Sequence, residues 1–87
     1  MDYRVIQEFK LKGDPPTQEQ LDRLRERLAE AAPGAESDIE LGVGRMRVLL
    51  TFDEAEAEVA VERAQRCAGA VFGGNAVHVQ VEPARPV

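Results

Sequence analysis

The segment RMRVLLTF, residues 45–52, alternates between two sets of side chains over its whole length. A period of two residues is typical of a β-strand that has one buried face. The apolar set comprises Met46, Val48, Leu50 and Phe52, and the opposite set comprises Arg45, Arg47, Leu49 and Thr51. We therefore expect a strand at the centre of the fold, with one side in the core and one side outside it.

Two stretches have the period of a helix instead. Residues 17–32 begin with Thr17 and, three residues later, Gln20, which is a capping-box signature. Residues 53–72 begin with Asp53 and Glu56 in the same spacing and end before Gly73. Their apolar stripes comprise Leu21, Leu24, Leu28, Ala31 and Ala32 in the first helix, and Ala57, Ala60, Val61, Ala64, Ala68 and Val71 in the second. We expect both helices to bury one face.

Three further segments alternate as strands, at residues 3–11, 37–43 and 77–82. In the first of them, Gln7 interrupts the apolar side and Ile6 interrupts the polar side. Gly42-Val43-Gly44 has the composition of a hairpin turn before the strand at 45–52. The predicted element order is therefore βαββαβ.

This order predicts an α+β fold, a ferredoxin-like βαββαβ two-layer sandwich with an antiparallel sheet of order 4-1-3-2. We expect residues 1–82 to form a single ferredoxin-like domain and residues 83–87 a short extended C-terminal tail. A chain of 87 residues can build one small core. A ligand cavity is therefore expected on the surface or between copies of the chain.

Composition restricts the partners. Sixteen acidic and eleven basic residues give a net charge of −5, which disfavours nucleic acid and anionic membranes. Cys67 is the one cysteine, so no internal disulfide forms and a cytoplasmic protein is expected. A lone thiol in a helix is expected to be a small apolar residue. We predict no metal site and no cofactor.

Two protein families share this element order, but particular residues of this chain differ from what each family requires. Residues 50–54 resemble the end of the third strand of RNA-recognition domains, but Arg47 and Leu49 stand where those domains carry base-stacking aromatic residues. Acylphosphatases need an arginine in the loop after the first strand, and residues 13–16 contain none. We therefore predict neither activity.

The candidate site is the sheet face that no helix covers. Its candidate ligand or interface residues are Arg4, Ile6, Glu8, Arg45, Arg47, Leu49, His78 and Gln80. We expect Arg45 and Arg47 to pair with Asp38 and Glu40 across the hairpin. Glu8 is the expected partner of His78 if the strand register brings them together.

Three functions are compatible with this face. The main prediction is a small cytoplasmic interaction or accessory protein without catalytic activity that self-associates as a homodimer. The first alternative is a small-molecule-binding protein or modest enzyme whose site forms between protomers and uses His78, Glu8, Arg47 and Gln7. The second is an acidic, immunity-like protein that neutralises a basic partner. Val59, on the outer side of the second helix, could mark a contact patch.

Overall fold

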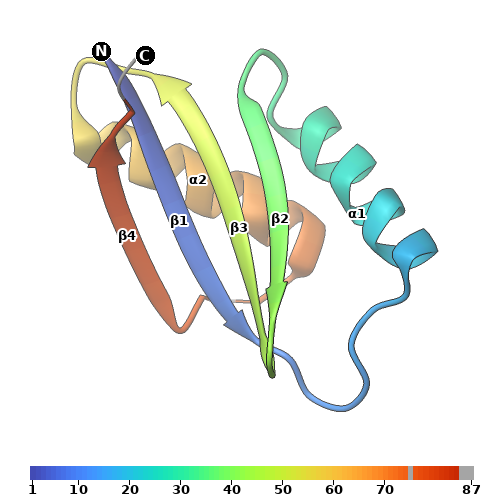
Figure 1. Ribbon diagram of the computed structural model, residues 1–87. Helices are drawn as coiled ribbons and strands as arrows, with labels where there is room; N and C mark the ends of the chain where they lie inside the picture. Colours follow the sequence, from blue (N-terminus) through green and yellow to red (C-terminus); the bar gives the residue numbers. More distant parts are fainter. Residues whose placement is uncertain (75, 85–87) are drawn as a thin grey trace.

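The computed structural model describes residues 1–74 and 76–84 and confirms the predicted element order. Two helices and four strands follow one another along the chain (Figure 1). Their bounds are β1 Asp2–Lys10, α1 Gln18–Ala31, β2 Glu36–Gly42, β3 Arg45–Asp53, α2 Ala57–Phe72 and β4 His78–Pro83.

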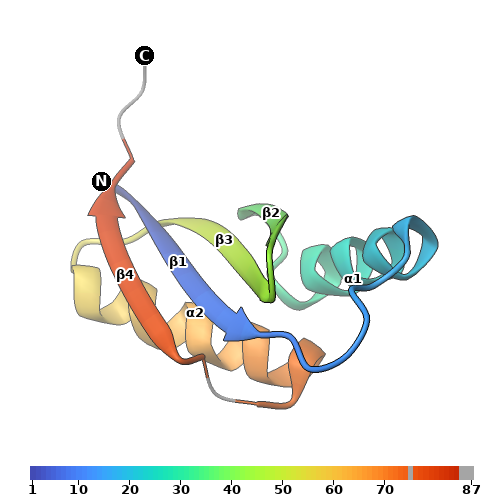
Figure 2. The same ribbon diagram turned by 60° about the horizontal axis from the view of Figure 1, so that its bottom comes forward.

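The four strands form one antiparallel sheet in the order β2-β3-β1-β4. This is the predicted order 4-1-3-2 counted from the other edge, so the fold prediction is confirmed. Both helices lie on one side of the sheet (Figure 2). Helix α2 packs on β1, β3 and β4, whereas α1 packs on β2 and on α2. Within the described residues, the opposite face of the sheet has no covering layer.

The core lies between the sheet and the helices and uses the predicted apolar faces. Val5, Val48 and Leu50 of the sheet are fully buried, as are Leu28 of α1 and Ala64 of α2. Alanines at every fourth position of α2 allow this helix to approach the sheet closely, because a methyl group is its largest side chain there. Burial of an aliphatic side chain of the size of leucine contributes about 1.5 to 3 kcal/mol.

Of the two predicted helix starts, the one at Thr17 is confirmed and the one at Asp53 was wrong. The capping box at Thr17 is present in full: its Oγ1 accepts the Gln20 backbone N–H, and the Gln20 side chain accepts the Thr17 backbone N–H. The predicted start at Asp53 was wrong, because Asp53 still pairs with Asp2 and the next backbone N–H, of Glu54, donates to the Met1 carbonyl. This strand pairing delays α2, whose N-cap is Glu56 without a side-chain hydrogen bond.

The last strand extends further than expected. β4 includes Pro83, and the backbone N–H of Ala84 donates to the Asp2 carbonyl at 2.8 Å. The predicted tail at 83–87 therefore begins with two residues that lie against β1, and its remaining residues, 85–87, lie outside the described part of the chain.

Neither of the two helices is long and apolar enough to cross a membrane, as far as the chain is described.

Candidate functional site

The uncovered face of the sheet holds all eight predicted site residues. Strand pairing sets them in adjacent rows across the sheet. Ile6 lies between Leu49 on β3 and Gln80 on β4, and Glu8 lies between Arg47 and His78. Arg4 and Arg45 lie one row beyond these pairs, at opposite ends of the face. The register thus brings Glu8 opposite His78, which sequence alone could not establish.

Glu8 is the centre of the charges on this face. Its Oε1 lies 3.6 Å from Arg45 Nη1 and 3.6 Å from Arg47 Nε, and only 18% of its side chain is exposed. Two guanidinium groups on one carboxylate make a compact cluster with a net positive charge. The central position of β1 explains the low exposure, since β3 and β4 flank Glu8 on both sides.

The expected pairing of the arginines with β2 was wrong. Glu40 lies opposite Arg47 in the register, but both arginines pair with Glu8 of β1 instead. The Asp38 carboxylate has other partners. Its Oδ1 accepts a hydrogen bond from the backbone N–H of the next residue, Ile39, at 2.8 Å, and lies 3.7 Å from Arg25 Nε of α1. Half-buried Glu8 offers the arginines a better-shielded carboxylate than the exposed edge strand does.

The face is shallowly hollowed beside its apolar centre. Ile6 and Leu49 are half-buried neighbours there. A hollow of about 350 Å³ adjoins Leu49 and is lined by Arg4, Glu36, Ser37, Asp38, Glu40, Leu49 and Thr51. At the far edge Arg4 pairs with Glu82 at 3.6 Å. Acidic and basic side chains are thus mixed on this face, which does not favour the immunity-like alternative.

Gln7 does not belong to this site. Its side chain points to the helix side, is 2% exposed, and donates from Nε2 to the Ala64 carbonyl of α2 at 3.0 Å. The alternation of β1 requires this orientation, because residues 5, 7 and 9 share one face. The expectation that Gln7 contributes to a site with His78 was therefore wrong.

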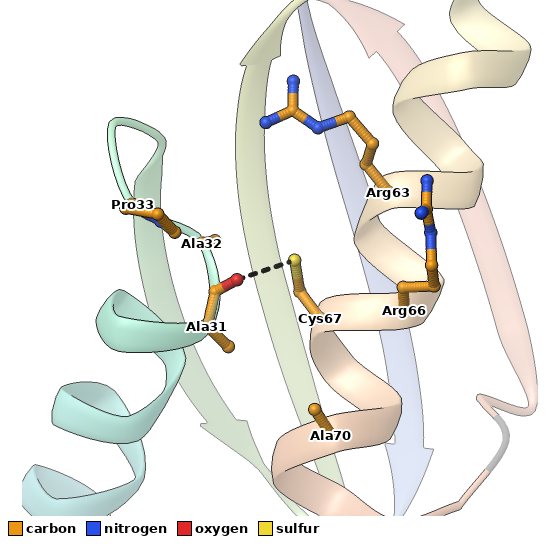
Figure 3. A pocket seen from close by; sticks show the side chains of 7 residues that line it. All are labelled: Ala31, Ala32, Pro33, Arg63, Arg66, Cys67 and Ala70. Carbon is orange, nitrogen blue, oxygen red and sulfur yellow. Dashed lines mark hydrogen bonds between the residues drawn. The ribbon is translucent and has the colours of Figure 1, made fainter.

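A second hollow, which the sequence did not suggest, lies between the helices (Figure 3). Its volume is about 390 Å³, and its lining comprises Ala31, Ala32, Pro33, Arg63, Arg66, Cys67 and Ala70. We call it the interhelical groove. The Cys67 thiol donates to the Ala31 carbonyl at 3.3 Å and so links the two walls. The small residues at 31–33 were the one signal that could have indicated it.

The two arginines of the groove differ in their partners. Arg63 Nη1 pairs with Glu54, and the Arg63 guanidinium lies 4.5 Å from the centre of the Phe52 ring. Arg66 is exposed, and no carboxylate in residues 1–74 or 76–84 pairs with it. The same residues contain no group of three side chains suited to a metal ion.

Comparisons with known proteins give one likeness to a solved structure. No family model matches the chain, and no curated protein matches it. A chain described as a putative antibiotic biosynthesis monooxygenase from Chloroflexus aurantiacus J-10-fl has 15% sequence identity and a TM-score of 0.53. The match covers 100% of this chain and 96% of the other. At this identity, the likeness shows that the two chains share a fold.

This likeness corrects the main functional prediction. We expected a non-catalytic accessory protein, because a chain this short leaves little room for a cavity inside its own core. A chain of nearly the same extent and the same fold is described as a putative enzyme, so that expectation was wrong. The first alternative, a small-molecule-binding protein or modest enzyme, agrees better with the finding.

Proposed function

We propose that this protein binds a small organic molecule, and acts on it, in a cavity that closes between the uncovered sheet faces of two copies. One observation carries the proposal: an apolar centre of Ile6 and Leu49 adjoins the charged cluster on Glu8, with His78 opposite. Ligand sites combine such an apolar surface with a few converging polar groups.

A second copy supplies what one copy lacks. The hollow beside Leu49, about 350 Å³, falls within the range of small-molecule sites of roughly 300 to 1,000 Å³. Its floor is a sheet, and no described residue of the same chain covers it. A second sheet packed face to face would provide the roof, since such sheets lie about 10 Å apart. Homodimerisation is therefore part of the proposal.

The charges favour one arrangement of the two copies. With a twofold axis in the interface and parallel to the strands, β3 of one copy faces β1 of the other. Leu49 then meets Ile6 of the second copy, and Arg47 meets Glu8. An axis perpendicular to the strands would place the acidic β2 edges against each other, which like-charge repulsion opposes.

Enzymatic activity is the second half of the proposal. His78 is the chain's one histidine, and it lies opposite Glu8, beside the place where a substrate on this face would bind. The similar chain is described as a putative monooxygenase, so oxidation of an organic substrate by O₂ is the first reaction to test, in which one oxygen atom enters the substrate and the other leaves as water with two hydrogens of the substrate. A cytoplasmic setting, with the half-buried Cys67 kept reduced, is the compartment we propose.

The test compares two substitutions of the same kind. Leu49→Asp places a charge at the apolar centre, and Val59→Asp places one on the outer side of α2, where Val59 is 36% exposed. Sedimentation velocity from micromolar to millimolar concentration should show dimers for the unmodified protein and Val59→Asp, and monomers for Leu49→Asp. A thermal-shift panel of small organic compounds should give hits that Leu49→Asp loses.

Two results would overturn the proposal. One is a protein that remains monomeric over the whole concentration range. The other is a ligand-induced shift that Leu49→Asp retains in full. His78→Ala separates binding from reaction, because it should keep the ligand-induced shift and lose turnover.

A further inference from the structure

We propose that the interhelical groove is a second binding site, which takes a small carboxylate with a short apolar chain. It differs from the site proposed above in two respects. It lies on the helix layer, and a single chain forms it completely.

The shape of the groove follows from small side chains. Ala31, Ala32 and Pro33 form one wall at the end of α1, and Ala70 of α2 contributes to the other. Because these side chains are short, they leave about 390 Å³ between the helices, enough for a small ligand. The hydrogen bond from Cys67 to Ala31 holds the two walls together at the floor. Apart from Arg63 and Arg66, the lining thus consists of small side chains.

The charge of the groove comes from α2. Arg63 also lines the groove, but its guanidinium already pairs with Glu54 and lies over the Phe52 ring. Arg66 lines the groove, is exposed, and pairs with no carboxylate of the described residues. A planar guanidinium binds a carboxylate through two parallel hydrogen bonds. Within residues 1–74 and 76–84 no carboxylate occupies Arg66, so a ligand carboxylate can pair with it.

The end of α1 determines the orientation of the ligand. A helix C-terminus carries about half a negative charge on its last carbonyl groups, and the last turn of α1 contains no basic residue. This end repels a carboxylate, whereas Arg66 attracts it. The apolar chain therefore lies along residues 31–33, and the carboxylate lies at Arg66.

The experiment titrates three probes of equal chain length into ¹⁵N-labelled protein: hexanoate, hexan-1-ol and hexylamine. We expect hexanoate to shift the amide signals of residues 31–33 and 66–70 and to bind tighter than the alcohol. Arg66→Gln should weaken hexanoate binding about fivefold, the effect of one exposed ion pair. Arg27→Gln makes the same charge change on the exposed side of α1 and should leave the Kd unchanged.

Two further measurements keep the test independent of that variant. Ala70 is exposed, so Ala70→Leu should extend into the groove without strain, weaken hexanoate binding and reduce the amide shifts at an unchanged Tm. In the unmodified protein, hexanoate should slow the alkylation of Cys67 by iodoacetamide.

Several outcomes would overturn the proposal. They are hexylamine binding as tightly as hexanoate, an unchanged Kd in Arg66→Gln, or amide shifts confined to the sheet. Leu49→Asp should bind hexanoate normally, because the groove needs no second copy. Failure of the dimer proposal and failure of this one are therefore distinguishable.

Discussion

Replacing Gln7 with glutamate tests how the sheet and α2 are joined. Gln7 is 2% exposed, and its Nε2 donates to the Ala64 carbonyl at 3.0 Å. Glutamate has the same shape, but when ionised it directs an acceptor oxygen at that carbonyl. An uncompensated buried charge costs about 3 to 5 kcal/mol. An 87-residue domain has a free energy of unfolding of about 4 to 13 kcal/mol, so Gln7→Glu should lose a large part of it at pH 7.

The loss should depend on pH in a definite direction. When the introduced carboxyl group is protonated, it can again donate to the Ala64 carbonyl, so the folded variant holds its proton more tightly than the unfolded chain does. The stability of the variant relative to the unmodified protein therefore falls as pH rises above about 4.3, the usual pKa of a glutamate side chain. Near pH 3.5 the difference should shrink to about 1 kcal/mol or less.

Urea unfolding followed by far-ultraviolet circular dichroism, at pH 3.5 and pH 7, measures both differences. Gln80→Glu is the matched control, because Gln80 is exposed on β4 and the same change there should stay within about 0.5 kcal/mol. A Gln7→Glu protein as stable as the control at pH 7 would refute the reasoning. So would a large loss that is the same at both pH values, since it would exclude ionisation as the cause.

Three further substitutions test other parts of the structure. Leu28→Ala removes a fully buried side chain between α1 and the sheet and should cost about 2 to 5 kcal/mol in urea unfolding. Thr17→Ala removes the cap of α1 and should cost about 1 kcal/mol, whereas Gln18→Ala, one position along, should cost less. Glu8→Gln leaves Arg45 and Arg47 without their carboxylate; we expect a loss of about 1 kcal/mol at low salt that diminishes in 1 M NaCl, and a salt-independent loss would contradict the ion-pair interpretation.

The sequence was sufficient to predict which side chains of β3 are buried. It was insufficient to predict which residues of the neighbouring strands lie beside them. Alternation alone predicted that Val48 and Leu50 are buried and that Arg47 is not, because a strand turns successive side chains to opposite faces. The partners of Arg47 depend on register, which links residues that lie far apart in the chain. The prediction therefore paired Arg47 with the neighbouring hairpin strand and missed its ion pair with Glu8.

Tertiary packing explains the other differences. Asp53 has the local signature of an N-cap, but pairing with β1 keeps it in the strand. The interhelical groove depends on the distance between the end of α1 and the middle of α2, and no local pattern encodes that distance. Small residues at 31–33 are equally compatible with tight packing and with an open groove.

The two proposed sites differ in whether they need a second copy of the chain. The uncovered face offers Ile6 and Leu49 with a charged cluster beside them, but it has a floor and no roof, so its ligand affinity must rise with dimer formation. The interhelical groove has both walls in one chain, and the Cys67 hydrogen bond joins them, so its affinity should not depend on protein concentration. Dilution below the dimer dissociation constant therefore separates the sites without any substitution: a ligand of the face is released, and a ligand of the groove remains bound.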